Sequence, residues 1–218
     1  MLAGQRKVAS DGYEVMLFPL EIMWMTQGEH QGYCMDFQGA QYNSNNQVVR
    51  RYRCPLYAPC SCKCVARSSS GDWQVFTSIN PVHIPGSSTP VTISFQIGHD
   101  NTPQTVGSTF TQGDLIGHTG TNGNVSGDHL HYNIAIGNYT APWSGQLNNS
   151  IHIYNGCYVD DTVLYRNGSY NWRVYGDTPT PPDPPHPPVP GHPRVRKYPW
   201  FTLTSKKLHR WQTNKNMI

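Results

Sequence analysis

The chain has 218 residues, of which 13% are charged and 37% hydrophobic, and it contains 20 glycines, 18 prolines and 13 tyrosines. This length accommodates one domain of ordinary size plus an appendage, and it excludes a long multi-enzyme architecture. The composition favours a turn-rich β domain and excludes a coiled coil. The net charge of +3 hides an asymmetry, since every charged residue from 194 to 218 is basic and the residues before them carry a net charge of −4.

Apolar and polar residues alternate with a period of two along several segments, the pattern of a β-strand with one buried face. The two clearest segments are Val91 to Ile97 and Leu130 to Ile136, and we expect both to be half-buried strands. In chain order, the strands that we predict are Gln47 to Arg53, Cys60 to Ala66, Trp73 to Ile79, Val91 to Ile97, Leu130 to Ile136 and Asp161 to Arg166. Because no window shows a helical stripe, the predicted fold is mainly β, an antiparallel sheet with few or no helices.

A proline-rich stretch divides the chain. Residues 176–193 hold nine of the eighteen prolines and almost nothing that could enter a core, so we expect an extended polyproline-type spacer. We therefore predict a catalytic domain over residues 1–176, a linker over 177–193, and over 194–218 a basic docking tail or a fragment of a further module. Basic ends of this kind touch nucleic acid, an anionic wall or another protein, and simply solvated ends are as common.

No segment is apolar over the roughly 20 residues that a bilayer span requires. The longest apolar run near the start, Met16 to Leu20, contains a proline, and Asp11 and Glu14 stand where the apolar region of a secretion signal would lie. We expect neither membrane insertion nor export by a standard signal.

Two histidines separated by one residue form the sharpest feature of the sequence. On a strand, His129 and His131 project from the same face, while Leu130 and Tyr132 point to the other face and into a core. Two adjacent imidazoles can share a metal ion, or one can bind it while its neighbour transfers protons. The alternative is a pair of surface histidines on an edge strand.

Further ligand-type residues lie upstream. His30 and Asp36 are six positions apart, and His99 follows the strand that begins at Val91. One imidazole and one carboxylate, added to one member of the histidine pair, supply three protein ligands, and catalytic zinc sites have three protein ligands and an open position for water. The pattern therefore indicates metal-assisted hydrolysis.

Four separated motifs in this order resemble the lysostaphin/LytM-type zinc endopeptidases, which cut peptidoglycan cross-bridges. The likeness covers roughly residues 19–136, and the motifs are Thr26-Gln27-Gly28, His30-x-Gly32 leading to Asp36-Phe37, Gly113-Asp114-Leu115-Ile116-Gly117 with Thr119-Gly120, and Gly127-Asp128-His129-Leu130-His131, with Tyr57-Ala58-Pro59 before a strand. The Thr-Gln-Gly opening looks most like bacteriophage-encoded versions.

The resemblance implies a groove walled by long loops and one catalytic Zn²⁺ held by His30, Asp36 and His131. It also implies that His99 and His129 act on the water and the transition state, with their separate roles left open. The six-residue step from His30 to Asp36 is longer than in many relatives, which weakens the assignment of Asp36. His118 lies in the turn-rich segment near this groove; the alternatives are a residue that lines the groove and a solvated loop residue, and we expect the latter.

The run Cys60-Ser61-Cys62-Lys63-Cys64 departs from the family pattern. Its three thiols would share one face of a strand, where residues two apart are poorly placed to bond one another. Buried free thiols, disulfides to Cys34, Cys54 or Cys157, and a second zinc site all remain open at this point.

The expected function is therefore a zinc endopeptidase that cuts the peptide part of bacterial peptidoglycan, as a tail-borne phage lysin or an endolysin. Its expected partners are the wall substrate and other phage tail proteins, contacted through residues 194–218, and we expect no nucleic-acid binding. The alternatives are a catalytically silent LytM-like wall-binding module and a structural tail protein. We expect the protein in the phage tail or released at host lysis.

Overall fold

The computed structural model describes residues 1–140 and 146–176. The predicted linker (177–193) and basic tail (194–218) lie outside the described residues. Within the described ranges nearly all regular structure is β, and the only helix is the single turn α1 (Ile153–Gly156). The prediction of a mainly β fold with few or no helices is confirmed. None of the described helices is long and apolar enough to cross a bilayer.

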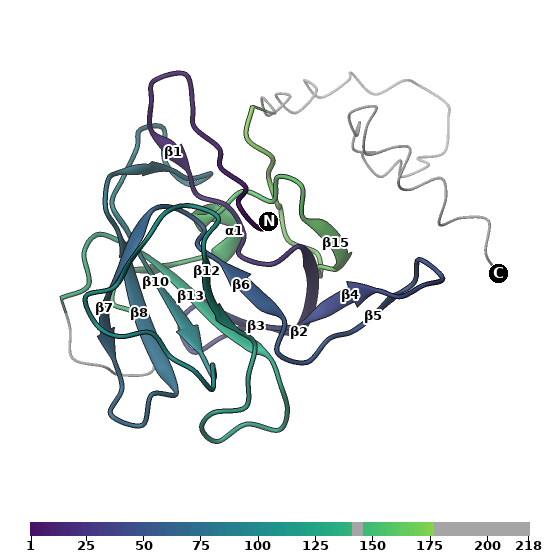
Figure 1. Cartoon of the computed structure of the whole chain (residues 1–218). Helices are drawn as coiled ribbons and strands as arrows, with labels where there is room; N and C mark the ends of the chain where they lie inside the picture. Colours follow the sequence, from purple (N-terminus) through teal and green to yellow (C-terminus); the bar gives the residue numbers. More distant parts are fainter. Residues whose placement is uncertain (141–145, 177–218) are drawn as a thin grey trace, which may run out of the picture. The chain divides into compact units, whose positions relative to one another are not determined.

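The strands are short, and most are joined by turns (Figure 1). They are β1 (Glu14–Val15), β2 (Ile22–His30), β3 (Cys34–Gln38), β4 (Ala40–Tyr42), β5 (Val48–Arg50), β6 (Pro55–Tyr57), β7 (Cys62–Arg67), β8 (Trp73–Ser78), β9 (Val82–His83), β10 (Ile93–Gly98), β11 (Thr109–Phe110), β12 (Leu115–His118), β13 (Leu130–Ile136), β14 (Ser150–Ile151) and β15 (Val163–Arg166).

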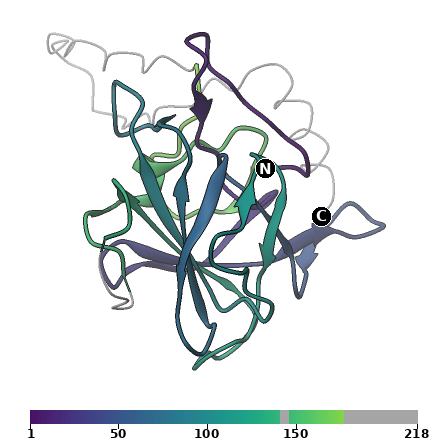
Figure 2. The ribbon, with the colours of Figure 1, turned by 60° about the vertical axis from the view of Figure 1, so that its left-hand side comes forward.

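One large sheet organises the described residues. Its order is β11-β7-β8-β10-β13-β3-β2-β15, with β14 paired to β13, and its pairs are antiparallel except that β15 runs parallel to β2. Small two-stranded sheets join β1 to β9, β6 to β12 and β4 to β5. Figures 1 and 2 both show the β4–β5 hairpin projecting from the large sheet.

The main hydrophobic core lies on one face of the large sheet. Phe95 of β10 and Tyr132 of β13 point into it, and Phe18 from the segment before β2 packs edge-on against Phe37 of β3 with ring centroids 4.9 Å apart. The opposite face carries a smaller apolar cluster around Val75, Ala135 and Leu147. Because successive strand residues alternate between faces, His131 and Ala135 share the face with the smaller cluster.

The expectation of half-buried strands is wrong for the two strands with the clearest alternation. Every residue of β10 is buried, and β13 is exposed only at Ile136. Apolar clusters pack on both faces of this part of the sheet, so the alternate polar residues of these strands are buried as well. Asn133, for example, accepts hydrogen bonds from the Leu147 N–H at 2.9 Å and from Ser150 Oγ at 3.0 Å. His131 is therefore not a surface residue on an edge strand, whereas His129 directly precedes β13 and is half-buried.

Candidate metal centre

One row of paired residues crosses five neighbouring strands and carries the candidate site. Trp73 of β8 is paired with Gly98 of β10, Gly98 with His131 of β13, His131 with Asp36 of β3, and Asp36 with Gln27 of β2. Residues that are directly opposite on neighbouring strands have closely spaced side chains. The sheet register therefore brings His131 and Asp36 together, although they are far apart in the sequence.

Three of the predicted site residues converge on one point. His30, Asp36 and His131 each offer a ligand atom within 4.8 Å of the other two. Asp36 Oδ1 lies 2.9 Å from His131 Nδ1 and 3.6 Å from His30 Nε2. His30 reaches this point because it ends β2, where the β2–β3 hairpin pairs it with Cys34, two residues before Asp36.

The donor set fits a zinc ion. Ligand atoms about 2.0 to 2.1 Å from a tetrahedral zinc lie roughly 3.3 Å from one another, and the two distances from Asp36 Oδ1 bracket that value. Asp36 Oδ1 is also buried and lacks a hydrogen-bond partner among the described residues. A buried carboxylate oxygen without a partner is costly unless a cation satisfies it.

The ring orientation of His30 also suits a ligand. Its Nδ1 lies 2.8 Å from the carbonyl oxygen of Gly28, which can only accept, so Nδ1 carries the proton. The lone pair is then on Nε2, the atom that faces Asp36. Fixing the tautomer through the second ring nitrogen is the usual way in which proteins orient a metal-binding histidine.

His99 and His129 stand beside this cluster and are oriented in the same way. Nδ1 of His99 donates to the carbonyl oxygen of Asn122, and Nδ1 of His129 donates to that of Gly127, each at 2.8 Å. Their ring centroids are 4.7 Å apart, and Nε2 of His129 is 3.7 Å from Asp36 Oδ2. Each neutral ring therefore has its lone pair on Nε2, where it can accept a proton.

The backbone at His99 is held in the left-handed region, with φ of 70°. A residue with a Cβ adopts this conformation only where its surroundings enforce it. Here the His99 N–H donates to the Asp72 carbonyl, and the His99 carbonyl accepts from Asn122 N–H, so Asn122 binds both the backbone and the ring of His99. The end of β10 is thus bent so that the imidazole turns toward His129.

Burial and mutual contacts set the protonation states of the cluster. Burial lowers the pKa of His131 below its usual 6.5, despite the opposing effect of Asp36, and burial likewise lowers the pKa of His99. Burial alone would raise the pKa of Asp36, but contact with His131 and the charges of His129 and His30 outweigh it, and the pKa is lowered. Neutral imidazoles and an ionised carboxylate are the forms that bind a metal ion.

The sequence-based reasoning missed Trp73 and Gly98. The Trp73 ring lies edge-on to His131 at 4.5 Å and packs against His99 at 5.0 Å, both between ring centroids. A Cβ on Gly98 would lie 2.8 and 2.9 Å from carbon atoms of this ring. The absence of a side chain at Gly98 therefore leaves room for the Trp73 ring beside the candidate ligand His131. In the sequence, the only signal at Trp73 is that it begins a predicted strand.

The six cysteines form no second metal site in the described residues, where only His30, Asp36 and His131 gather as a group of potential ligands. All six are free and buried. Burial raises the pKa of each thiol, to about 12 for Cys34. Cys62 and Cys64 share the buried face of β7 with exposed Lys63 between them, as the sequence predicted. Of the three alternatives for these residues, the structure has buried free thiols.

Three other histidines lie apart from the cluster. His118 is not a solvated loop residue: it ends β12, and its Nδ1 is buried without a partner among the described residues. His83 pairs with Asp11 at 2.9 Å, and His152 contacts Glu29. Both therefore have an acidic partner.

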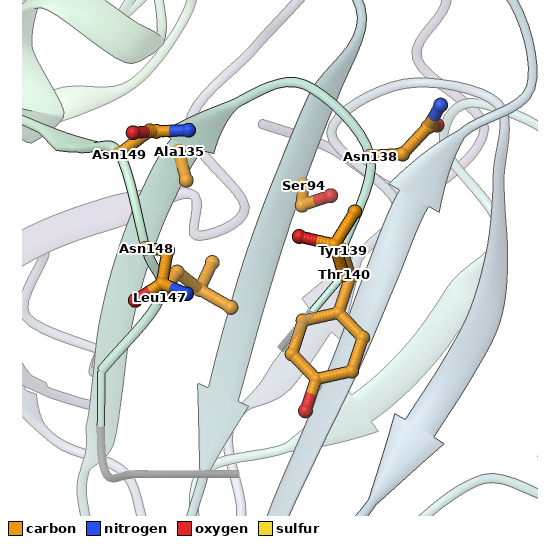
Figure 3. Close-up of a pocket in the computed structure, with 8 residues that line it drawn as sticks. All are labelled: Ser94, Ala135, Asn138, Tyr139, Thr140, Leu147, Asn148 and Asn149. Carbon is orange, nitrogen blue, oxygen red and sulfur yellow. The ribbon is translucent and has the colours of Figure 1, made fainter. Parts of the chain in front are cut away.

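Figure 3 shows a small pocket elsewhere on the sheet. Its lining residues are Ser94, Ala135, Asn138, Tyr139, Thr140, Leu147, Asn148 and Asn149. Ser94 and Ala135 are a registered pair, four residues along their strands from Gly98 and His131. At the usual rise of a strand, this places the pocket about 13 Å from the metal cluster. The pocket therefore includes none of the predicted site residues.

Comparison with known proteins finds a relative from a bacteriophage. No model of a protein family matches the chain. The chain is 32% identical over 177 residues to morphogenesis protein 1 of Bacillus phage B103, and the aligned region is 76% of this chain and 46% of that protein. The chain thus spans less than half the length of this relative.

Similar folds occur among solved peptidases. One is a zinc containing peptidase from Vibrio cholerae, with 14% identity, a TM-score of 0.38, and coverage of 60% of this chain and 43% of that chain. Another is the catalytic domain of the antimicrobial peptidase lysostaphin from Staphylococcus simulans, with 16% identity, a TM-score of 0.34, and coverage of 56% and 80%.

Proposed function

We propose that this chain is a zinc-dependent endopeptidase that hydrolyses peptide cross-links or stem peptides of bacterial peptidoglycan. The observation that carries the proposal is the cluster itself: donor atoms of His30, Asp36 and His131 lie within 4.8 Å of one another, and two further histidines stand beside them. Three protein ligands leave a position for water, which is the arrangement of catalytic rather than structural zinc.

In this proposal His30 Nε2, Asp36 Oδ1 and His131 Nδ1 hold the ion. A bound zinc ion lowers the pKa of water toward about 7 and polarises a peptide carbonyl. The chain supplies the Asp36 carboxylate, whose pKa is lowered, and the His131 imidazole, whose pKa is lowered by burial, so both are in the metal-binding form near neutral pH.

His99 and His129 provide the proton transfers. Each presents a lone pair at Nε2, because its Nδ1–H is committed to a backbone carbonyl. One accepts the proton of the attacking water, and the other, once protonated, hydrogen-bonds the developing oxyanion or returns a proton to the leaving amine.

A phage context is part of the proposal. It is supported by the 32% identity to a phage morphogenesis protein. A protein that takes part in building a virion is well placed to be carried on it, so we propose a tail-borne lysin, with release at host lysis as the alternative. The basic residues 194–218 are proposed to dock the enzyme on another tail protein.

The test measures the products of wall digestion. Purified full-length protein is incubated with peptidoglycan sacculi, with and without a chelator, and the soluble fragments are identified by mass spectrometry. New amino termini should appear, disappear with chelator and return with zinc. The His131→Ala variant should lose both zinc and activity, whereas His83→Ala, which alters a histidine paired with Asp11 outside the cluster, should retain both. Wild-type digestion by His131→Ala would refute the ligand assignment, and zinc binding without digestion would indicate a silent wall-binding module.

A further inference from the structure

Three of the four residues from 50 to 53 are arginines, and two of them are hydrogen-bonded to segments beside the candidate site. Arg50 ends β5, Arg51 follows it, and Arg53 precedes Cys54, and all three side chains are exposed. Arginine keeps its charge at all physiological pH values. Among the described residues, no carboxylate lies within ion-pair distance of any of the three guanidinium groups, although other basic residues, such as Lys7 with Asp160, do form ion pairs.

Arg50 is anchored next to His129. Its Nη2 donates to the carbonyl oxygen of Asp128 at 3.0 Å and lies 3.2 Å from the position that a Cβ on Gly127 would occupy. Gly127 is also the residue whose carbonyl orients the His129 ring. Arg50 stacks over Tyr52 as well, with its guanidinium carbon 4.6 Å from the ring centroid.

Arg53 is anchored on the loop that follows His99. Its Nη1 donates to Asn101 Oδ1 at 3.1 Å and its Nη2 to Thr102 Oγ1 at 3.2 Å. The two arginines are thus fixed to the two loops that carry the proposed proton-transfer histidines. All of these acceptors are neutral, so neither positive charge is compensated by them.

The carboxylate of Asp128 does not form an ion pair with the guanidinium group of Arg50 or Arg53. Asp128 is buried, and its two carboxylate oxygens accept from the Thr119 hydroxyl at 2.5 Å and from the backbone N–H of Arg53 at 3.1 Å. A guanidinium has five N–H donors in a planar fork that matches a carboxylate. Among the described residues, the Arg50 guanidinium donates one hydrogen bond and that of Arg53 donates two, which leaves N–H groups of both side chains available for a ligand.

We infer that Arg50 and Arg53 form a carboxylate-binding subsite that selects wall peptides with a free carboxyl group close to the bond that is cut. The inference rests on the proposed function. A peptide advances at most about 3.3 to 3.6 Å per residue, so a carboxyl group one or two residues from a bond held at His129 can reach this rim. Wall peptides provide such groups, because a glutamate linked through its γ-carboxyl leaves its α-carboxyl free.

The experiment compares two substrates that differ only in charge. Cross-linked muropeptides with free carboxyl groups, and the same preparation after chemical amidation, are digested by the zinc-loaded full-length protein, and kcat/KM is measured for each. Because hydrogen bonds to a charged group are strong but these side chains are exposed to solvent, we expect about a tenfold preference for the free carboxylates. The preference should weaken with added salt.

Two sets of variants isolate the arginines. The double variant Arg50→Gln, Arg53→Gln should cleave both substrates at nearly equal rates, so that the wild-type preference for free carboxylates is lost. Arg166→Gln, which alters an arginine on the edge strand β15, should keep the wild-type preference. A general loosening of the loops would slow both substrates alike and leave their ratio unaltered, so the ratio reports the subsite itself.

The outcomes separate the subsite from the proposed function. Failure of the zinc-loaded protein to cleave either substrate would refute the proposed function and the subsite with it. Equal wild-type cleavage of both substrates, or an undiminished preference in the double variant, would overturn the subsite alone. If the double variant were impaired only on walls that retain their phosphate-containing polymers, the bound anion would be phosphate and the peptide carboxylate would be excluded.

Discussion

Replacing Gly98 with alanine tests the packing that positions the candidate ligands. Gly98 lies between Trp73 and His131 in the sheet register. A Cβ there would lie 2.8 Å from Trp73 Cζ3, 2.9 Å from Trp73 Cε3 and 3.0 Å from His131 Cβ. Since real Cβ atoms rarely approach other atoms so closely, the tryptophan ring or the His131 strand must move.

The size of the effect follows from two opposing contributions. Overpacking a core costs about 1 to 3 kcal/mol, and alanine reduces the entropy of the unfolded chain by an equivalent of about 0.4 to 1 kcal/mol. We therefore expect a net loss of about 1 to 2 kcal/mol in the free energy of unfolding. A shift of about 1 Å in His131 would lower the hydrolysis rate by a factor of about 100.

Three measurements on this variant separate stability from site geometry. Denaturant unfolding gives the stability, a competitive chelator titration gives the zinc affinity, and fragment release from sacculi gives the rate. The double variant Gly98→Ala, Trp73→Phe is the control, because phenylalanine lacks the outer ring that carries the clashing atoms, and it should recover much of the stability. If Gly98→Ala alone unfolds and binds zinc as the wild type does, the packing argument is wrong.

Three further predictions concern the site and its surroundings. His99→Ala and His129→Ala should each retain zinc but lower the hydrolysis rate about 10² to 10⁴-fold, because they remove proton transfer and not a ligand. Asp128→Asn should cost about 1 to 3 kcal/mol of stability, since the amide has a single oxygen and can accept from only one of the two donors, the Arg53 N–H and the Thr119 hydroxyl. The buried thiols should resist alkylation at pH 8, and stability should fall above pH 9, by up to about 1.4 kcal/mol per pH unit for each thiol, because they ionise in the unfolded chain but stay protonated when folded.

Each of these predictions has its own check. Zinc content is measured by atomic absorption, and loss of the metal from His99→Ala or His129→Ala would contradict the proton-transfer role of that histidine. If the Asp128→Asn variant unfolds at the same midpoint temperature as the wild type, the hydrogen bonds of the Asp128 carboxylate contribute little to stability. Rapid labelling of native protein by a thiol reagent at pH 8, or stability that does not change from pH 8 to 10.5, would contradict the burial of the cysteines.

Local patterns were enough to predict several elements. The alternation in Leu130 to Ile136 matches β13, and the strands expected near Cys60 to Ala66 and Trp73 to Ile79 correspond to β7 and β8 within two residues at each end. Neighbouring side chains on a strand point to opposite faces, so a strand with one buried face shows apolar residues at every second position of its sequence.

The strands that bring His30 and Asp36 to the site were not predicted. In β2 the register shifts twice, between Met25 and Gln27 and again between Gln27 and His30. Each such irregularity breaks the two-residue period, so the pattern on which the prediction depends is lost. In β3 nearly every residue is buried, and a strand covered on both faces shows no alternation.

The residue types that can bind zinc and move protons, and their order along the chain, are properties of the sequence alone, because imidazole and carboxylate chemistry does not depend on the fold. The distances between these residues are not properties of the sequence alone, because they depend on which strands become neighbours and in which register the strands pair. Only the tertiary structure places His131 opposite Asp36, packs Trp73 against the glycine beside them, and anchors Arg50 and Arg53 on the segments next to His129 and His99. These contacts join segments far apart in the chain, and no local pattern encodes them.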